Sequence, residues 1–156
     1  MRKLVIVNGP NNNFYGIRNK GQYGNQLYAD LIEELKAYGA SIGFEVEAFQ
    51  NNGEGAIIDY FQSLYFEAEK SGCRIPMVLN PGAFTHYSYA IKDALESVHT
   101  MVPAIEVHMS NIQGRDDFRH TSVTASECLG QISGMGKNSY KIAMEAFKQM
   151  IEEGHL

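Results

Sequence analysis

The sequence lacks long apolar runs, and it lacks any cluster of basic residues. Its longest apolar stretches, such as residues 4–7, are far shorter than the roughly 20 residues that span a bilayer. Thirteen lysines and arginines stand against eighteen aspartates and glutamates, which gives a net charge of −5. An acidic chain without a basic run is poorly suited to bind nucleic acid or an anionic membrane, so we expect neither partner.

Cysteine is scarce as well, since Cys73 and Cys128 are the only two. They fit no zinc or redox spacing, and the motifs HExxH, CxxC and GxxxxGK are absent. The sequence therefore predicts neither a dedicated metal site nor a P-loop. The chain starts with basic residues, and the short apolar run that follows them ends at Asn8 and Gly9. This pattern is typical of a strand and not of a signal peptide. We expect a cytoplasmic protein with reduced thiols.

Short β-rich runs alternate with amphipathic helical stretches along the 156 residues, whose length suits one domain. Strands are expected over residues 4–8, 44–50, 76–80, 103–109 and near 131–133. Helices are expected over about 25–39 and 55–70, after residue 86, and at the end of the chain. This order predicts an α/β fold in which a five-stranded parallel sheet carries helices on both faces.

The spacing of apolar residues predicts which face of each helix is buried. The expected inward residues are Leu27, Leu31 and Leu35 in the first helix, Ile57, Phe61 and Leu64 in the second, Ile91, Leu95 and Val98 in the third, and Ile142, Ala146 and Met150 in the last. Tyr140, at the start of the last helix, is also expected in the core. Ser71 and Gly72 are expected to close the second helix.

Polar clusters follow each of the first four strands, reading NGPNNN, QNNGEG, NPGAFTH and HMSN. Ligands of an open parallel sheet bind outside the carboxyl ends of its strands, so these clusters are expected to meet at one rim. Helix capping explains some of the asparagines and serines. It does not explain the roughly seventeen-residue loop after the first strand, because so long a loop in a compact domain is usually functional. We expect a site at this rim, with that loop as its lid.

The rim offers groups for proton transfer. Arg18 and Tyr23 lie on the long loop, where a guanidinium favours the ionised phenolate and makes the tyrosine a plausible base. His108 ends the fourth strand, and Glu106 shares its side of that strand. A carboxylate beside an imidazole can fix its tautomer and support it as a general acid.

Each of these groups also has a simpler interpretation. A histidine at a strand end, such as His108, can be satisfied by backbone groups alone. His86 can begin a helix without binding anything, and the arginines Arg115 and Arg119 can pair with the two aspartates between them. A guanidinium is nevertheless the natural partner of a carboxylate substrate, so the positions taken together favour a site.

Five motifs stand in order between residue 4 and about residue 147: NGPNNNFYGIRNKGQYG, QNNGEGAIIDYFQ, NPGAFTHYSYAIKDAL, IEVHMSNIQGRDDFRH and GQISGMG. In these motifs the sequence resembles a known family, type II 3-dehydroquinate dehydratase (type II dehydroquinase). The resemblance implies a flavodoxin-like three-layer sandwich, one catalytic domain over residues 1–156, and trimers that usually form a dodecamer. The implied reaction is the anti elimination of water from 3-dehydroquinate to 3-dehydroshikimate, through an enolate and without a cofactor. It belongs to the shikimate pathway of aromatic amino acid biosynthesis or to quinate catabolism.

The same resemblance implies roles for individual residues. Tyr23 would be the base, Arg18 would keep it ionised, and Asn11 would hold the water that stabilises the enolate. His108 would protonate the departing hydroxyl, oriented by Glu106. The implied substrate-binding residues are Asn80, His86, Met109, Ser110 and Arg119, together with Asp93, which would reach the site of a neighbouring subunit.

Some positions depart from the family pattern. Asn19 and Lys20 replace a usual Glu-Pro, Gly53 replaces a histidine, and Asn12-Asn13 stands where leucine-containing sequence is usual. These departures keep an alternative open, a flavodoxin-like paralogue that binds a related cyclic acid or a nucleotide without this catalysis. A phospho-receiver domain is disfavoured, because it needs an aspartate where this chain has Asn80.

Overall fold

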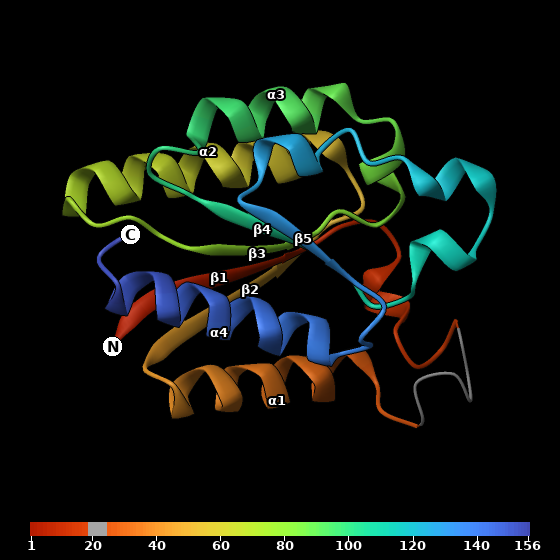
Figure 1. Ribbon diagram of the computed structural model, residues 1–156, viewed down its shortest axis with the longest axis horizontal. Helices are drawn as coiled ribbons and strands as arrows, with labels where there is room; N and C mark the ends of the chain where they lie inside the picture. The colour runs from red at the N-terminus through yellow and green to blue at the C-terminus, as the bar shows by residue number, and fades with distance from the viewer. Residues whose placement is uncertain (19–24) are drawn as a thin grey trace.

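The computed structural model describes residues 1–18 and 25–156, which form a three-layer α/β sandwich (Figure 1). Five parallel strands lie in the order β2-β1-β3-β4-β5. Their bounds are β1 (Arg2–Asn8), β2 (Phe44–Gln50), β3 (Met77–Asn80), β4 (Ala104–His108) and β5 (Gly130–Ser133). The predicted fold is confirmed, and each predicted strand differs from the observed one by at most two residues at an end.

Helices cover both faces of the sheet. The helices are α1 (Tyr28–Ser41), α2 (Glu54–Ser71), α3 (Tyr89–Val98) and α4 (Asn138–Glu152). Figure 1 shows α2 and α3 on one face and α1 and α4 on the other. Gly72 closes α2 in the left-handed conformation, with φ of 70°, as the sequence predicts. Among the described residues, no helix is both long and apolar enough to cross a bilayer.

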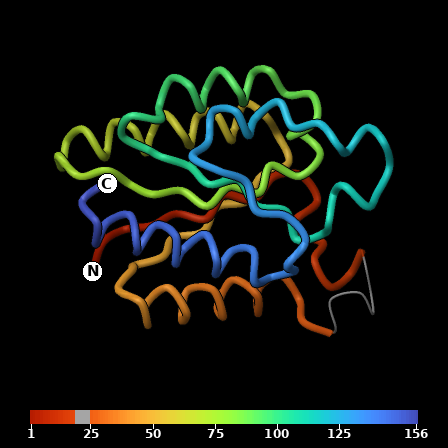
Figure 2. The backbone as a smooth tube through the Cα atoms, in the orientation of Figure 1, coloured from red at the N-terminus to blue at the C-terminus, as the bar shows by residue number. Residues whose placement is uncertain are grey.

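The central strands β1 and β3 contain continuous apolar runs because helices bury both of their faces. In β1, Val5 and Val7 pack toward α2 and α3, whereas Leu4 and Ile6 pack toward α1 and α4. All four side chains are 0% exposed. Both chain termini lie at the amino end of the sheet, away from the loops that follow β1 and β4 (Figure 2). The carboxyl end of the sheet is therefore left to the polar loops.

Two predicted helix faces are partly wrong. Leu27 is 48% exposed because α1 begins one residue later, at Tyr28. In α4 the predicted core position of Tyr140 is confirmed, and Ala143, Met144 and Phe147 are buried with it. The predicted Ile142 is 44% exposed, and Ala146 and Met150 are only partly buried. The Tyr140 hydroxyl makes hydrogen bonds with Asn8 and Asn80 at the ends of β1 and β3, which places this aromatic stripe inward.

An ionic cluster joins α1 to α4. Lys137 and Lys141 lie 2.8 and 2.7 Å from the Glu34 carboxylate, which also accepts from the Gln26 amide at 2.7 Å. The hydrogen bonds from Lys137, Lys141 and Gln26 lower the pKa of Glu34 to about 2 from its ordinary 4.5. A lowered carboxyl pKa stabilises the folded state above the ordinary pKa, and this stability is lost as the pH falls toward the folded value.

We therefore expect Glu34→Gln to lower the free energy of unfolding near pH 7 by about 1 kcal/mol, because solvent screens this partly exposed cluster. The difference from the wild type should shrink between pH 4.5 and about pH 2, the window that the lowered pKa defines. Chemical denaturation across this range measures it. Glu33→Gln is the matched control, since the Glu33 side chain is 75% exposed and its neighbour is a single lysine. A difference that stays constant with pH would contradict the assigned ion pairs.

Candidate active site

The polar loops after β1 and β3 meet at the carboxyl end of the sheet. The Gly9 backbone N–H donates to the Asn80 carbonyl oxygen at 2.8 Å, and the Gln50 amide from β2 donates to the Gly9 carbonyl at 3.1 Å. Beneath them, the Tyr140 hydroxyl donates to the Asn8 side chain and accepts from the Asn80 amide at 3.0 Å. This hydrogen-bond network holds the ends of β1, β2 and β3 together, so the side chains of the loops that follow these strands have defined positions.

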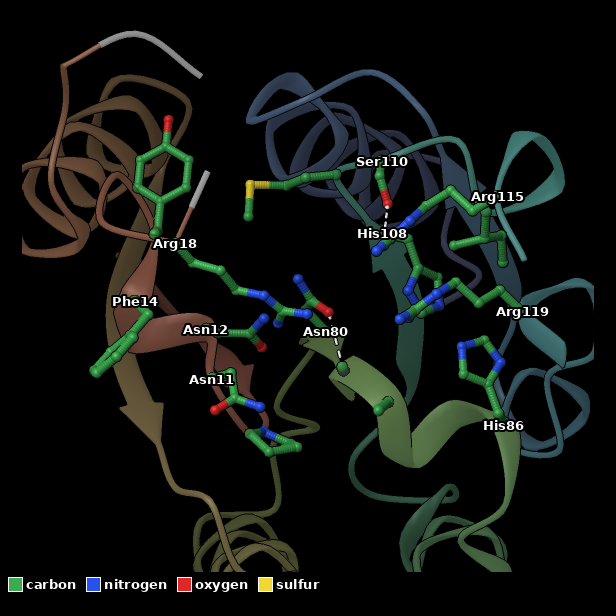
Figure 3. Close-up of a pocket in the computed structure, with 16 residues that line it drawn as sticks. Asn11, Asn12, Phe14, Arg18, Asn80, His86, His108, Ser110, Arg115 and Arg119 are labelled. Atoms are coloured by element: carbon green, nitrogen blue, oxygen red, sulfur yellow. Dashed lines mark hydrogen bonds between the residues drawn. The ribbon is translucent and has the colours of Figure 1, made fainter. Parts of the chain in front are cut away.

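Eight of the eleven residues predicted for the site line one cavity at this rim (Figure 3). They are Asn11, Arg18, Asn80, His86, His108, Met109, Ser110 and Arg119. Glu106 lies behind His108 and is 0% exposed. Asp93 is exposed on α3 and is not among the residues that line the cavity. Tyr23 lies outside the described residues, so the structure does not place the predicted base.

His108 and Glu106 form a buried pair at the end of β4. The His108 Nε2 atom lies 3.0 Å from Glu106 Oε2, and the histidine side chain is 7% exposed. A carboxylate can only accept, so Nε2 carries the proton and Nδ1 is left for a ligand. This geometry confirms the predicted contact between the two side chains and argues against a histidine satisfied by backbone alone.

The pKa of the Glu106 carboxyl is lowered although the group is buried. Burial by itself would raise the pKa of Glu106. The hydrogen bond and charge of His108, together with hydrogen bonds from the Thr124 and Ser122 hydroxyls, outweigh burial and leave the pKa of Glu106 below its ordinary value. An ionised carboxylate balances the positive charge that His108 bears when both ring nitrogens are protonated.

Three guanidinium groups, of Arg18, Arg115 and Arg119, line the cavity and favour an anionic ligand. Arg115 donates to the Ser110 hydroxyl at 3.2 Å. Arg119 lies 3.3 Å from Asp116, so the ion pair predicted for this cluster is present, but its guanidinium still reaches the cavity. Figure 3 shows Arg18 and Arg119 reaching into the cavity from opposite sides.

His86 has one ring nitrogen committed to the protein. Its Nδ1 lies 2.8 Å from the Thr121 carbonyl oxygen, which can only accept. Nδ1 is therefore the protonated nitrogen in the neutral ring, and Nε2 is available to accept from a hydroxyl of a ligand. The alternative interpretation, a histidine that merely begins a helix, does not account for its position in the cavity wall.

The described ends of the long loop lie together at the cavity edge. Gly16 has φ of +81°, and a Cβ atom there would stand 2.1 Å from the Gln26 carbonyl oxygen. The Tyr15 hydroxyl donates to the Gln26 side chain at 3.2 Å. Asn11 takes the left-handed conformation, with φ of 66°, and its N–H donates to the Asn52 side chain at 3.1 Å. The loop thus starts and ends against fixed neighbours.

A sequence model of the family described as dehydroquinase class II matches residues 2–148. The chain belongs to this family. It is 48% identical over 152 residues to a 3-dehydroquinate dehydratase of Caldicellulosiruptor bescii, with 97% of this chain and 100% of that protein covered. A 3-dehydroquinate dehydratase of Thermotoga maritima is 50% identical over 151 residues, with 97% and 98% covered.

A solved class II dehydroquinase has the same fold. The crystal structure of the type II dehydroquinase from Butyrivibrio crossotus DSM 2876 matches with a TM-score of 0.85 and 49% identity, covering 93% of this chain and 96% of that one. The family resemblance seen in the sequence is confirmed. A paralogue that only binds a ligand is not favoured, because the similarity to dehydratases extends over nearly the whole chain.

The sequence interpretation missed several residues of this dehydroquinase site. Arg115, for which the sequence allows either a surface ion pair or a contact with a carboxylate ligand, is not among the predicted site residues, yet it lines the cavity. Around Glu106, the additional contacts are Thr85, Ser122, Thr124 and Gln131. Thr85 stands within the NPGAFTH motif and could have been found there. The other three depend on how the chain after β4 folds back along the sheet, which no local pattern reveals.

Proposed function

We propose that this enzyme is a dehydratase that removes water from 3-dehydroquinate to give 3-dehydroshikimate. The observation that carries the proposal is His108, held by buried Glu106 and opening onto the same cavity as the Arg18 guanidinium. Elimination next to a ketone needs a base for the carbon acid, donors for the oxyanion, and an acid for the leaving oxygen. The rim and its loop carry a candidate for each role.

The first step uses the long loop. The Tyr23 phenolate takes a proton from the carbon next to the ketone, on the side opposite the hydroxyl that leaves. The electron pair of the broken C–H bond moves toward the ketone oxygen and forms an enolate. Arg18 keeps Tyr23 ionised through its positive charge, and Asn11 holds a water that donates to the enolate oxygen.

The second step uses the end of β4. As the enolate returns to a ketone, the C–O bond to the hydroxyl breaks and a carbon–carbon double bond forms. His108 donates its proton to the departing oxygen, so the leaving group is water. Glu106 balances the charge of the doubly protonated ring and orients it. The anti geometry follows because base and acid approach the ring from opposite faces.

The remaining residues of the cavity bind the substrate. Its carboxylate suits the backbone and hydroxyl of Met109 and Ser110, and its ring hydroxyls suit the Asn80 amide, the His86 Nε2 atom and the Arg119 guanidinium. We propose no metal or organic cofactor, since proton transfer and oxyanion stabilisation account for the whole reaction. Residues 1–156 act as one catalytic domain.

The reaction is tested by the ultraviolet absorbance of the conjugated enone that it forms. Purified protein with 3-dehydroquinate should show a rising absorbance, and quinate, which lacks the ketone, should give none. Folded protein that leaves 3-dehydroquinate unchanged would contradict the proposed function and favour a paralogue with another cyclic acid as its ligand.

We also propose that the enzyme forms trimers, four of which assemble into a dodecamer in the cytoplasm, where it serves aromatic biosynthesis or quinate breakdown. Asp93 supports the trimer proposal, since it is exposed on α3 and does not line the cavity of its own chain. In a trimer it would reach the substrate of a neighbouring subunit.

Asp93→Ala is expected to raise the KM for 3-dehydroquinate by roughly tenfold, because the substrate loses one hydrogen bond. The substitution should leave helix α3 intact. Glu96→Ala, also exposed on α3, is the control and should leave KM unchanged. Sedimentation shows the assembly directly. A mass of one subunit at assay concentrations would overturn both the assembly and the role of Asp93.

A further inference from the structure

The Glu106 carboxylate is enclosed by side-chain donors. Among the described residues, its Oε2 atom contacts His108 and Thr85 at 3.0 Å, Ser122 at 2.9 Å and Gln131 at 2.6 Å. Its Oε1 atom accepts from the Thr124 hydroxyl. A carboxylate that is 0% exposed needs such partners, because a buried charge without hydrogen bonds is strongly unfavourable. The five donors differ, because the hydroxyl groups among them can also accept a hydrogen bond.

The three hydroxyls cannot satisfy all of their contacts at once. Besides their contacts with Glu106, Thr85 lies 2.7 Å from Ser122 and 3.0 Å from Thr124, and these last two lie 3.3 Å apart. A hydroxyl carries one proton, so three protons must serve six contacts. The hydroxyl cluster can also accept, which means that it could receive a proton from a neutral Glu106. The Thr124 and Ser122 hydroxyls help to lower the pKa of Glu106, but the three hydroxyls are not obligatory donors to it.

Gln131 differs, because its amide nitrogen has two protons and accepts nothing. The residue lies in the edge strand β5, directly beside Glu106 in the register of β4 and β5. Cross-strand partners share a face of the sheet, which explains the short 2.6 Å contact between Gln131 Nε2 and Glu106 Oε2. The residue is otherwise exposed, so it can be replaced without opening the core.

We propose that Gln131 is a positioning residue for the acid step, whose amide keeps Glu106 ionised and its Oε2 atom directed at His108. A proton on Oε2 would face the Gln131 N–H, which has no lone pair to receive it. Glu106 thereby remains the charged partner that His108 needs when both of its ring nitrogens are protonated. The inference rests on the proposed dehydratase function and assigns Gln131 no contact with substrate.

Few titratable groups surround this carboxylate in the described part of the chain. His108 lies on the same strand, and the Cys128 thiol approaches from the segment before β5. Burial and the charge of Glu106 raise the pKa of Cys128, so the thiol stays neutral. The other contacts are the neutral hydroxyls and the Gln131 amide. A change at residue 131 therefore acts on the Glu106–His108 pair with little interference.

Two variants separate the effect of the amide donor from the effect of side-chain size. Gln131→Met keeps the length of the side chain and removes the donor. Gln131→Glu puts a second carboxylate beside the first, and two such groups tend to share one proton. Both should lower kcat by about 10- to 100-fold, part of the contribution of a general acid, with KM within twofold of the wild type. Gln149→Met, on the exposed side of α4, is the matched control and should match the wild type.

A readout independent of turnover separates this inference from the proposed function. Carbon-13 NMR can follow the Glu106 carboxyl carbon as the pH falls, with its signal assigned by its loss in Glu106→Gln. Glu106 should take up a proton at a higher pH in both Gln131 variants than in the wild type. A wild-type protein without turnover would overturn the proposed dehydratase function. The titration of Glu106 would then still test the role of Gln131. Identical titrations in wild type and variants, or a raised KM with unchanged kcat, would overturn the role of Gln131.

Discussion

Replacing His108 by alanine is expected to lower kcat by about 10²- to 10⁴-fold, the range that a positioned general acid contributes. Without the imidazole, the hydroxyl must leave as hydroxide, because no other described acid is held against Glu106 at the end of β4. KM should change little if the ring acts mainly in the transition state. Steady-state kinetics with 3-dehydroquinate measures both quantities.

The same substitution removes a partner of a buried carboxylate, so loss of fold must be distinguished from loss of chemistry. His108→Gln serves this purpose, since its amide can still donate to Glu106 but cannot transfer a proton. It should fold like the wild type and remain as inactive as the alanine variant. His99→Ala is the control histidine, exposed at the end of α3 and bonded to its own helix. A His108→Gln variant with near-normal kcat would remove His108 from the acid role.

Gly9→Ala is the second large effect that we expect. A Cβ atom at Gly9 would stand 2.4 Å from the Pro81 carbonyl oxygen and 2.7 Å from its carbon, which are both backbone atoms. The loops after β1 and β3 would have to separate, and Asn11 and Asn80 would move with them. We expect a loss of about 3 kcal/mol in the free energy of unfolding, the upper part of the range for overpacking, and a marked loss of turnover.

Gly55→Ala is the matched control for this substitution. Gly55 lies in the first turn of α2, and a Cβ atom there has no neighbour within 4 Å. Alanine favours the helix over glycine, so this variant should be more stable than the wild type by up to about 1 kcal/mol. Thermal and denaturant unfolding of both variants provides the comparison. A Gly9→Ala variant as stable as the wild type would show that the two rim loops are not in close contact.

The sequence predicted the sheet because its signals are local. Strands β1 and β3 contain continuous apolar runs, β4 alternates apolar residues with Glu106 and His108, and each strand is followed by a polar loop. The inward face of α4 is harder to predict from the sequence, because apolar residues occur on two stripes of this helix. The stripe with Tyr140 is buried since its hydroxyl meets Asn8 and Asn80, partners 132 and 60 residues away. The sequence indicates Tyr140 as a core residue, but the periodicity within the helix does not show that Ala143 and Phe147 share its buried face.

In the site, too, local contacts are predictable from the sequence and long-range contacts are not. His108 and Glu106 are two residues apart, so the sequence alone indicated their contact. Gln131, Ser122 and Thr124 reach the same carboxylate only through the pairing of β4 with β5 and the path of the segment between them. The family resemblance implies roles for Glu106 and His108, and it implies none for these supporting contacts. The structure adds the hydrogen bonds that surround this buried pair.

In the proposed mechanism Tyr23 and His108 act on opposite faces of one substrate. This is tested most directly with 3-dehydroquinate carrying deuterium on the carbon next to the ketone, in the position anti to the hydroxyl that leaves. Mass spectrometry of the product gives the answer. The proposed mechanism predicts 3-dehydroshikimate without deuterium, and product that retains the label would contradict it.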